Sequence, residues 1–326
     1  MIAFAILTSC SIIFKPLRKI LIIIAALFLV SLSSSGQDNA SYYQDKQQKK
    51  NPKRDWKGSD EEEKDTVLHR VELGINFGAY FPNKYSANYY NGTPGNVNNV
   101  NYVMSNTYWY RDIKLALGSV DTVLVDGYPT DMHYNVAFTG GLFLRFNLNR
   151  WNGIFLQANY TQLRAEDVVT LEVDPDPYSL KFPDMRLTPI VGREGRVLID
   201  FGYQLSIPMK SKINIFIQAG ATMCYTQVIR SVFVPAGTEY SLINIYGDNI
   251  YVPNTNMQTI NINQNAFGFG GYLGVGAGIP LTDMFGIEPG FFTHYYPANL
   301  QGYPDFKPSF GLYLRIMLYF GKTGDD

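Results

Sequence analysis

The sequence predicts an all-β protein: an eight-stranded antiparallel β-barrel that spans a membrane and carries long extracellular loops. Three observations point to it. Eight segments between residues 69 and 320 alternate apolar and polar side chains, the connections between them alternate in length, and an export signal stands at the N-terminus. Together these features are typical of transmembrane β-barrels. Eight is the expected number of strands, and ten strands remain an alternative.

The N-terminus has the three parts of a secretory signal. Basic KPLRK (15–19) precedes the apolar run ILIIIAALFLVSL (20–32), and SSSGQ (33–37) follows with small residues where a signal peptidase would cut. A spanning helix needs about 20 apolar residues, so this run is too short to be an anchor. We therefore expect residues 1–36 to be a signal peptide that is removed on export, with Gln37 as the first residue of the mature chain.

The next segment is polar throughout. Residues 37–66 read QDNASYYQDKQQKKNPKRDWKGSDEEEKDT, with charge blocks of both signs. Such a segment cannot bury enough apolar surface to fold alone. We expect a disordered tail here, on the periplasmic side. Residues 67–321 then form the barrel, and 322–326 a short C-terminal tail.

Composition excludes several classes of function. Only 17% of the residues are charged, the net charge is -1 and the sequence pI is near 6.3, so nucleic acid is not an expected partner. The two cysteines, Cys10 and Cys224, are far apart and the first lies in the expected signal peptide. They offer neither a disulfide framework nor a zinc site. We expect no metal and no cofactor.

The clearest strand is GRVLIDFGYQLSIP, residues 195–208. Its odd positions from 197 to 207 read Val, Ile, Phe, Tyr, Leu and Ile, and its even positions from 196 to 206 read Arg, Leu, Asp, Gly, Gln and Ser. A period of two places each set on its own face of a strand. The other expected strands are residues 69–81, 135–147, 153–163, 212–226, 266–279, 284–296 and 309–320.

The connections give the direction of the barrel. Short turns (148–152, 209–212 and 280–283) alternate with long segments (82–134, 165–193, 227–265 and 297–308), so all the turns fall at one end and the long loops at the other. Aromatic residues also gather near the strand ends, as interfacial girdles require. We therefore expect the apolar face to meet lipid and the polar face to line the interior. An exported soluble β-sandwich or closed barrel shares the alternation but does not explain the one-sided loops.

From residue 69 to residue 320 the chain resembles the small outer-membrane β-barrel family of Gram-negative envelopes, the OmpA/OmpX-like and PorT-type proteins. The last strand, with Leu314, Ile316, Leu318 and Phe320 on one face, is similar to the C-terminal signal by which such barrels are recognised for assembly, although GKTGDD follows it here. The resemblance implies a Gram-negative outer membrane as the location. It also implies outer-membrane lipid and lipopolysaccharide as surroundings.

Six charged residues fall on the expected inner face: Glu72, Arg145, Arg196, Asp200, Glu288 and Arg315. The interior of an eight-stranded barrel is just wide enough for side chains to fill, and charges there must be paired. We expect a salt-bridge network that closes the lumen, with Arg196 beside Asp200 or Glu288. An ion or proton path is the alternative. We also expect Gly268–Gly278, the glycine row on the inner face of one strand, to make room for Phe216, Tyr272 and Tyr313.

The first long loop is rich in Tyr and Asn, the chemistry of recognition surfaces. Its RDIKLAL segment (111–117) favours a short helix. If the loop binds a partner, we expect Tyr89, Tyr90, Trp109 and Tyr110 to be the anchors; the alternative is a self-packed cap over the barrel mouth.

We expect no enzyme, because His133, His294, Asp131 and Ser231 at the loop end form no recognisable catalytic motif. The sequence favours a non-enzymatic outer-membrane barrel whose loops bind a protein partner or ligand, in the outer membrane or at the cell surface, within an envelope or secretion-related assembly. The alternatives are a narrow pore or transport accessory and, less favoured, a lipid A-modifying enzyme.

Overall fold

The computed structural model describes residues 69–174, 184–209, 213–243, 257–258 and 264–322. These residues belong to one compact unit, Asp65–Asp326. The expected signal peptide (1–36), the expected tail (37–66) and the last four residues of the chain lie outside the described residues. No helix among the described residues is long and apolar enough to cross a membrane.

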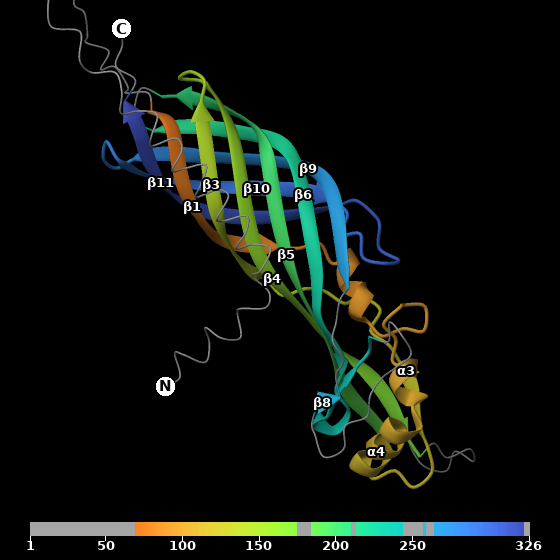
Figure 1. Cartoon of the computed structure of the whole chain (residues 1–326). Coiled ribbons are helices and arrows are strands. Elements are labelled where there is room, and N and C mark those ends of the chain that lie inside the picture. Colours follow the sequence, from red (N-terminus) through yellow and green to blue (C-terminus); the bar gives the residue numbers. More distant parts are fainter. Residues whose placement is uncertain (1–68, 175–183, 210–212, 244–256, 259–263, 323–326) are drawn as a thin grey trace, which may run out of the picture. The chain divides into compact units, whose positions relative to one another are not determined.

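Eight antiparallel strands close into a barrel (Figure 1). Each pairs with the next, and β1 pairs with β11 to complete the ring. The strands are β1 (His69–Phe81), β3 (Ala137–Asn147), β4 (Asn152–Val173), β5 (Asp184–Pro208), β6 (Asn214–Phe233), β9 (Asn265–Pro280), β10 (Phe285–Tyr296) and β11 (Lys307–Lys322). This confirms the predicted eight-stranded barrel.

The outer face of the barrel is apolar around the ring. Ile75 and Ile316 lie side by side in the register of β1 and β11, and both side chains are more than 40% exposed. Exposed apolar residues continue around the ring at Leu142, Leu156, Phe201, Ile217, Val275 and Phe291. In water this band would be unfavourable, and in lipid it is the surface that a spanning barrel presents.

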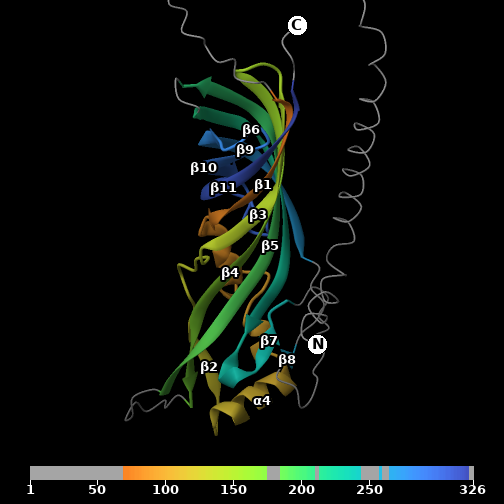
Figure 2. The ribbon, with the colours of Figure 1, turned by 90° about the vertical axis from the view of Figure 1, so that its left-hand side faces the viewer.

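Tight turns join the strands at one end. In the turn after β3, the amide of Leu148 donates to the carbonyl of Asn152 at 2.9 Å, and in the turn after β9 the amide of Leu281 donates to the carbonyl of Phe285 at 2.9 Å. The described parts of the long connections lie at the other end (Figure 2). The one-sided arrangement expected from the connection lengths is therefore present.

Three strands are longer than expected. β4 continues to Val173 and β5 begins at Asp184, so most of the segment 165–193 is a hairpin rather than a loop, and β6 continues to Phe233. The period of two persists, with Val169, Leu171 and Val173 buried on one face. The outer face of β4 changes from apolar to polar between Tyr160 and Gln162, so the extension stands outside the apolar band.

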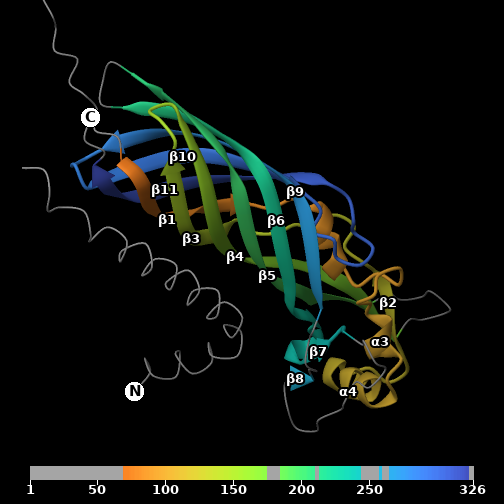
Figure 3. The same ribbon diagram turned by 45° about the horizontal axis from the view of Figure 1, so that its top comes forward.

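A cap of short elements packs against these extended strands (Figure 3). Its elements are η1 (Tyr85–Tyr90), α3 (Asn101–Met104), α4 (Thr107–Leu117), β2 (Val123–Gly127), η2 (Pro235–Gly237), β7 (Glu239–Ser241) and β8 (Met257–Gln258). α4 contains the predicted 111–117 helix and begins four residues earlier. The Asn106 side chain accepts hydrogen bonds from the amides of Tyr108 and Trp109, and Gly118 ends the helix at φ +72°.

Candidate functional site

The lower lumen holds a buried ion-pair cluster. The register sets Glu72 beside Arg145 and Glu288 beside Arg315. Arg145 pairs with Glu72 and, at 2.9 Å, with Glu288, while Arg315 pairs with Glu288 at 2.8 Å. Arg315 also donates to Asn76 at 2.7 Å and lies over the Phe143 ring at 3.3 Å from its centroid. All four charges therefore have an opposite partner, as burial requires.

The middle of the lumen is built around Asp200 and His294. The Nε2 atom of His294 lies 3.0 and 3.1 Å from the two carboxylate oxygens of Asp200. Gln157 Nε2 donates to Asp200 at 2.8 Å, and the Thr222 hydroxyl donates to it as well. Within the described part of the chain, the other ring nitrogen of His294 has no hydrogen-bond partner.

The upper lumen is organised by Arg196, whose partner differs from the one expected. Its Nε donates to Glu194 at 2.6 Å, and its terminal nitrogens donate to Tyr296 at 3.0 Å and Ser86 at 2.9 Å. Asp200 and Glu288 instead pair with His294 and with the lower arginines. The expected pairing of Arg196 with either of them was wrong, because Glu194 lies two residues away on the same face of β5. Tyr90 from η1 donates to Glu194 at 2.6 Å and so ties the cap to the lumen.

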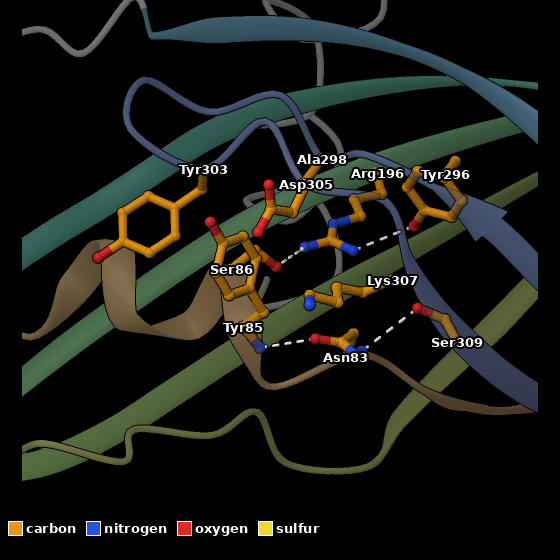
Figure 4. Close-up of a pocket in the computed structure, with 10 residues that line it drawn as sticks. All are labelled: Asn83, Tyr85, Ser86, Arg196, Tyr296, Ala298, Tyr303, Asp305, Lys307 and Ser309. Atoms are coloured by element: carbon orange, nitrogen blue, oxygen red, sulfur yellow. Dashed lines mark hydrogen bonds between the residues drawn. The ribbon is translucent and has the colours of Figure 1, made fainter.

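A small pocket opens at this level, above Arg196 (Figure 4). Its lining includes Asn83, Ser86, Tyr296, Lys307 and Ser309, and the Arg196 guanidinium reaches between Ser86 and Tyr296. The volume is about 10 Å³, roughly what one water molecule needs. The pocket can hold water at the mouth of the lumen, but it is too small for an organic ligand.

The glycines of the barrel give room to large inward side chains. A Cβ on Gly276 would lie 2.5 Å from the ring of Phe216, and one on Gly274 would lie 2.6 Å from the Tyr272 hydroxyl. Tyr313 takes its room from Gly290 on β10 instead of from the β9 row, since a Cβ there would lie 2.4 Å from its ring. The lumen is thus packed with aromatic and charged groups.

The structure places three of the four expected partner anchors inside the cap. Tyr89, Tyr90 and Trp109 are each at most 2% exposed, and Tyr110 is partly buried. The Trp109 ring lies 5.7 Å from that of Tyr240, and the Tyr89 hydroxyl donates to Gln264 at 2.5 Å. As they stand, these side chains shape the cap from within and do not form its surface.

The surface of α4 carries other groups. Tyr108, Arg111 and Leu115 lie at i, i+3 and i+7, which is one face of a helix. Leu115 is 73% exposed and Tyr108 58% exposed, and the Arg111 guanidinium lies 6.0 Å from the centroid of the Tyr108 ring. Burial of Trp109 and Ile113 on the opposite face holds the helix in place. Arg111 and Leu115 lie within the predicted 111–117 helix, but Tyr108 precedes it, so the sequence indicated only part of this face.

Asp174 fixes the loop that follows α4. Its carboxylate accepts from the Ser119 hydroxyl at 2.6 Å and from the amides of Val120, Asp121 and Thr122 at 2.8, 2.7 and 3.1 Å. These donors, first the Ser119 hydroxyl and then the amides, lower the pKa of Asp174 to about 2. The residue itself adopts a positive φ of 49° at the end of β4.

The residues weighed for catalysis do not come together. His294 bonds to Asp200, Asp131 pairs with Lys84 at 2.9 Å, and His133 is exposed. Ser231 is buried, and its hydroxyl has no partner among the described residues. Within the same residues, no group of three or more His, Cys, Asp or Glu side chains is placed to hold a metal ion.

No family model matches the sequence, and no curated protein matches it. Solved structures of small outer-membrane β-barrel proteins do. They include the attachment invasion locus protein Ail of Yersinia pestis in complex with the heparin analogue sucrose octasulfate (12% identity, TM-score 0.31, covering 77% of this chain and 98% of that one). Neisserial surface protein A is a further match, with 9% identity and a TM-score of 0.35 over 77% of this chain and 96% of that one. The outer membrane protein OprG of Pseudomonas aeruginosa matches with 10% identity and a TM-score of 0.34 over 78% of this chain and 96% of that one. With TM-scores of this size, the fold assignment rests on the closed strand ring itself.

Proposed function

We propose that the protein is a non-enzymatic barrel of a Gram-negative outer membrane whose cap binds a protein partner at the cell surface. The exposed face of α4 carries this proposal, because Leu115 and Tyr108 project from a helix that Trp109 and Ile113 anchor on its opposite side. The apolar band and the one-sided turns support the membrane location. The filled lumen supports binding over transport.

The α4 face fits a known mode of recognition. An amphipathic helix that lays side chains at i, i+3 and i+7 into a groove is a recurrent way to bind a protein. Tyr and Arg are also among the residues that contribute most to binding free energy. Because the cap is ordered before binding, little conformational entropy is lost when a partner docks.

The buried aromatic residues have a supporting role in this proposal. Trp109 and Tyr240 pack beneath α4, and Tyr89 and Tyr90 join the cap to the barrel. We assign Tyr89, Tyr90, Trp109 and Tyr110 to holding the binding surface in shape. Membership of a larger envelope or secretion-related assembly stays a prediction.

Site-specific photo-crosslinking in intact cells tests the proposal. A photoreactive amino acid at position 108 should give one discrete cross-linked product. The Leu115→Asp substitution should abolish this product, because it places a charge in the contact. Leu187→Asp, at a β5 position that is also exposed, is the matched control and should leave the product unchanged. Absence of any product, or equal loss in both variants, would exclude α4 as the contact.

Epitope accessibility tests the orientation. A tag inserted between residues 93 and 99, in the cap, should be labelled on intact cells. A tag in the turn after β3, at Asn149, should be labelled only after the outer membrane is permeabilised. Labelling of both tags on intact cells, or recovery of the protein in the soluble periplasmic fraction, would contradict the proposed location.

A further inference from the structure

Three arginines lie side by side on the outer surface of the barrel. Arg164 of β4 is directly opposite Arg193 of β5, and Arg193 is directly opposite Arg230 of β6. Residues in direct register share a face, and the neighbours of Arg193, Gly192 and Glu194, are buried towards the interior. The three guanidinium groups therefore project outward from adjacent strands that are about 4.8 Å apart.

Like charges directly opposite one another destabilise a sheet. Two of the three have a carboxylate nearby, since Arg164 pairs with Glu166 and Arg230 pairs with Glu239. Arg193, the central one, has no hydrogen-bond or ion-pair partner among the described residues. The row thus keeps one guanidinium, that of Arg193, whose charge no described residue neutralises.

The row stands at a defined height above the apolar band. Below it, four residues away on β4 and β5 and five on β6, where the register shifts by one residue, is a second row in register: Tyr160, Val197, Tyr225 and Phe267. The rings of Tyr225 and Phe267 lie 4.9 Å apart. Between the two lies a polar row of Gln162, Gly195 and Gln227. Aromatic side chains of this kind mark the membrane interface.

The spacing places the arginines at the level of lipid headgroups. Four residues of a strand span about 13 Å, and with a tilt near 40° this is about 10 Å along the membrane normal. From the membrane outward, the side chains on the outer face are first apolar, then aromatic, then amides and finally the guanidinium groups. A guanidinium offers a rigid fork of donors that matches a phosphate group.

We propose that Arg164, Arg193 and Arg230 bind a phosphate group on a lipid of the outer leaflet, a phosphorylated glycolipid whose acyl chains lie against the apolar band. Arg193 is the central contact. The site goes beyond the proposed partner binding by α4 and does not depend on it, because the arginines lie on the barrel wall and α4 lies in the cap.

Titration of the full-length protein, refolded in zwitterionic detergent, with bisphosphorylated lipid A tests the proposal by native mass spectrometry. The wild type should bind the lipid, and lipid A stripped of its phosphates should bind at least about tenfold more weakly. Arg193→Gln should weaken binding of the phosphorylated form by about tenfold while leaving the dephosphorylated form unaffected. Arg193→Lys should retain part of the affinity, because it keeps the charge.

Arg186→Gln is the matched control, since Arg186 lies on the same strand, seven residues further from the membrane, and pairs with Asp184. It should bind lipid A like the wild type. Heat-modifiable migration on gels establishes that each variant is folded. Equal affinity of Arg193→Gln and wild type, or of the two lipid forms, would overturn the proposal. Displacement of the lipid by inorganic phosphate at equal concentration would show that the three arginines bind a soluble anion, and it would overturn the proposal of a lipid ligand.

Discussion

At the residue scale, buried charge in the lumen is organised in separate levels. Arg145 and Arg315 are satisfied by Glu72 and Glu288, Asp200 by His294, and Arg196 by Glu194. Each ion pair lies within one level, so loss of one member leaves a particular partner unpaired. Gln157 joins the lower and middle levels, because it accepts a hydrogen bond from Arg315 at 3.1 Å and donates one to Asp200 at 2.8 Å. The effects of substitutions at these two levels should therefore be non-additive, as for residues in one hydrogen-bond network.

Arg196→Ala should destabilise the barrel by about 3–5 kcal/mol, because it leaves the Glu194 carboxylate buried without its cation. Val197→Ala, the next residue on β5 and on the opposite face, is the control and should cost much less. Urea unfolding followed by heat-modifiable migration measures both. Small, equal effects would mean that the upper lumen is hydrated and would favour the pore alternative.

Asp174 should make the loop after α4 sensitive to acid. Its pKa in the folded protein, about 2, is below the ordinary value of about 3.9. The stabilisation is therefore fully present above pH 4 and is lost as pH falls through 2. The protection of the amides of Val120, Asp121 and Thr122, measured as hydrogen exchange relative to the intrinsic rate at each pH, should fall over this range. Asp174→Ala should remove the protection at every pH, and a pH-independent profile in the wild type would contradict this role.

At the element scale, each of the long strands β4, β5 and β6 passes through two different environments. The lower parts of β4, β5 and β6 lie in the apolar band, and their upper parts form a sheet on which the cap folds. η1 sits at the junction, where a Cβ on Gly192 would lie 2.2 Å from the Tyr90 ring. η1 is therefore the part of the cap that packs into the barrel mouth.

Two deletions separate these roles. Replacing residues 101–118 with a short Gly-Ser linker should leave a folded, inserted barrel that no longer gives the cross-linked product. Deleting residues 88–118 also removes the hydrogen bonds from Tyr90 to Glu194 and from Tyr89 to Gln264. This barrel should therefore be less stable than the 101–118 variant by about 1–3 kcal/mol. Urea midpoints compare them, and equal midpoints would show that η1 does not stabilise the mouth.

Much of this architecture follows from the sequence alone. The period of two identifies all eight strands and the face of each that meets lipid. The one-sided turns set the direction in which each strand runs. The ends of β4, β5 and β6 do not follow, since the same alternation continues when the outer solvent changes from lipid to water. Glu194 was missed for that reason, and the burial of Tyr89, Tyr90 and Trp109 depends on contacts that composition does not encode.

At the scale of the whole molecule, the described residues form a barrel with a filled lumen and a folded cap at the loop end. Charged, amide and aromatic side chains fill its interior from the Glu72 level to the Tyr90 level, and the pocket at the mouth has the volume of about one water molecule. The described interior is thus filled with side chains, which the proposed binding role permits and an open channel would not.

Reconstitution into planar bilayers should accordingly show no stable open channel. Eight strands leave a lumen that side chains can fill, and here they do. A sample heated to its unfolded form controls for leaks caused by detergent. Discrete conductance steps that appear only with the folded protein would contradict the closed lumen and restore the pore alternative.

The pairing of β1 with β11 sets the order of events in biogenesis. Asn76 and Arg315, which meet across this seam, are separated by 239 positions in the chain. Until Lys307–Lys322 has emerged, β1 has no second neighbour, and its edge groups cannot be satisfied in lipid. The seam therefore cannot form during synthesis or translocation. Until the last strand is available the ring cannot close, and the apolar outer faces of the earlier strands are open to aggregation wherever they meet water.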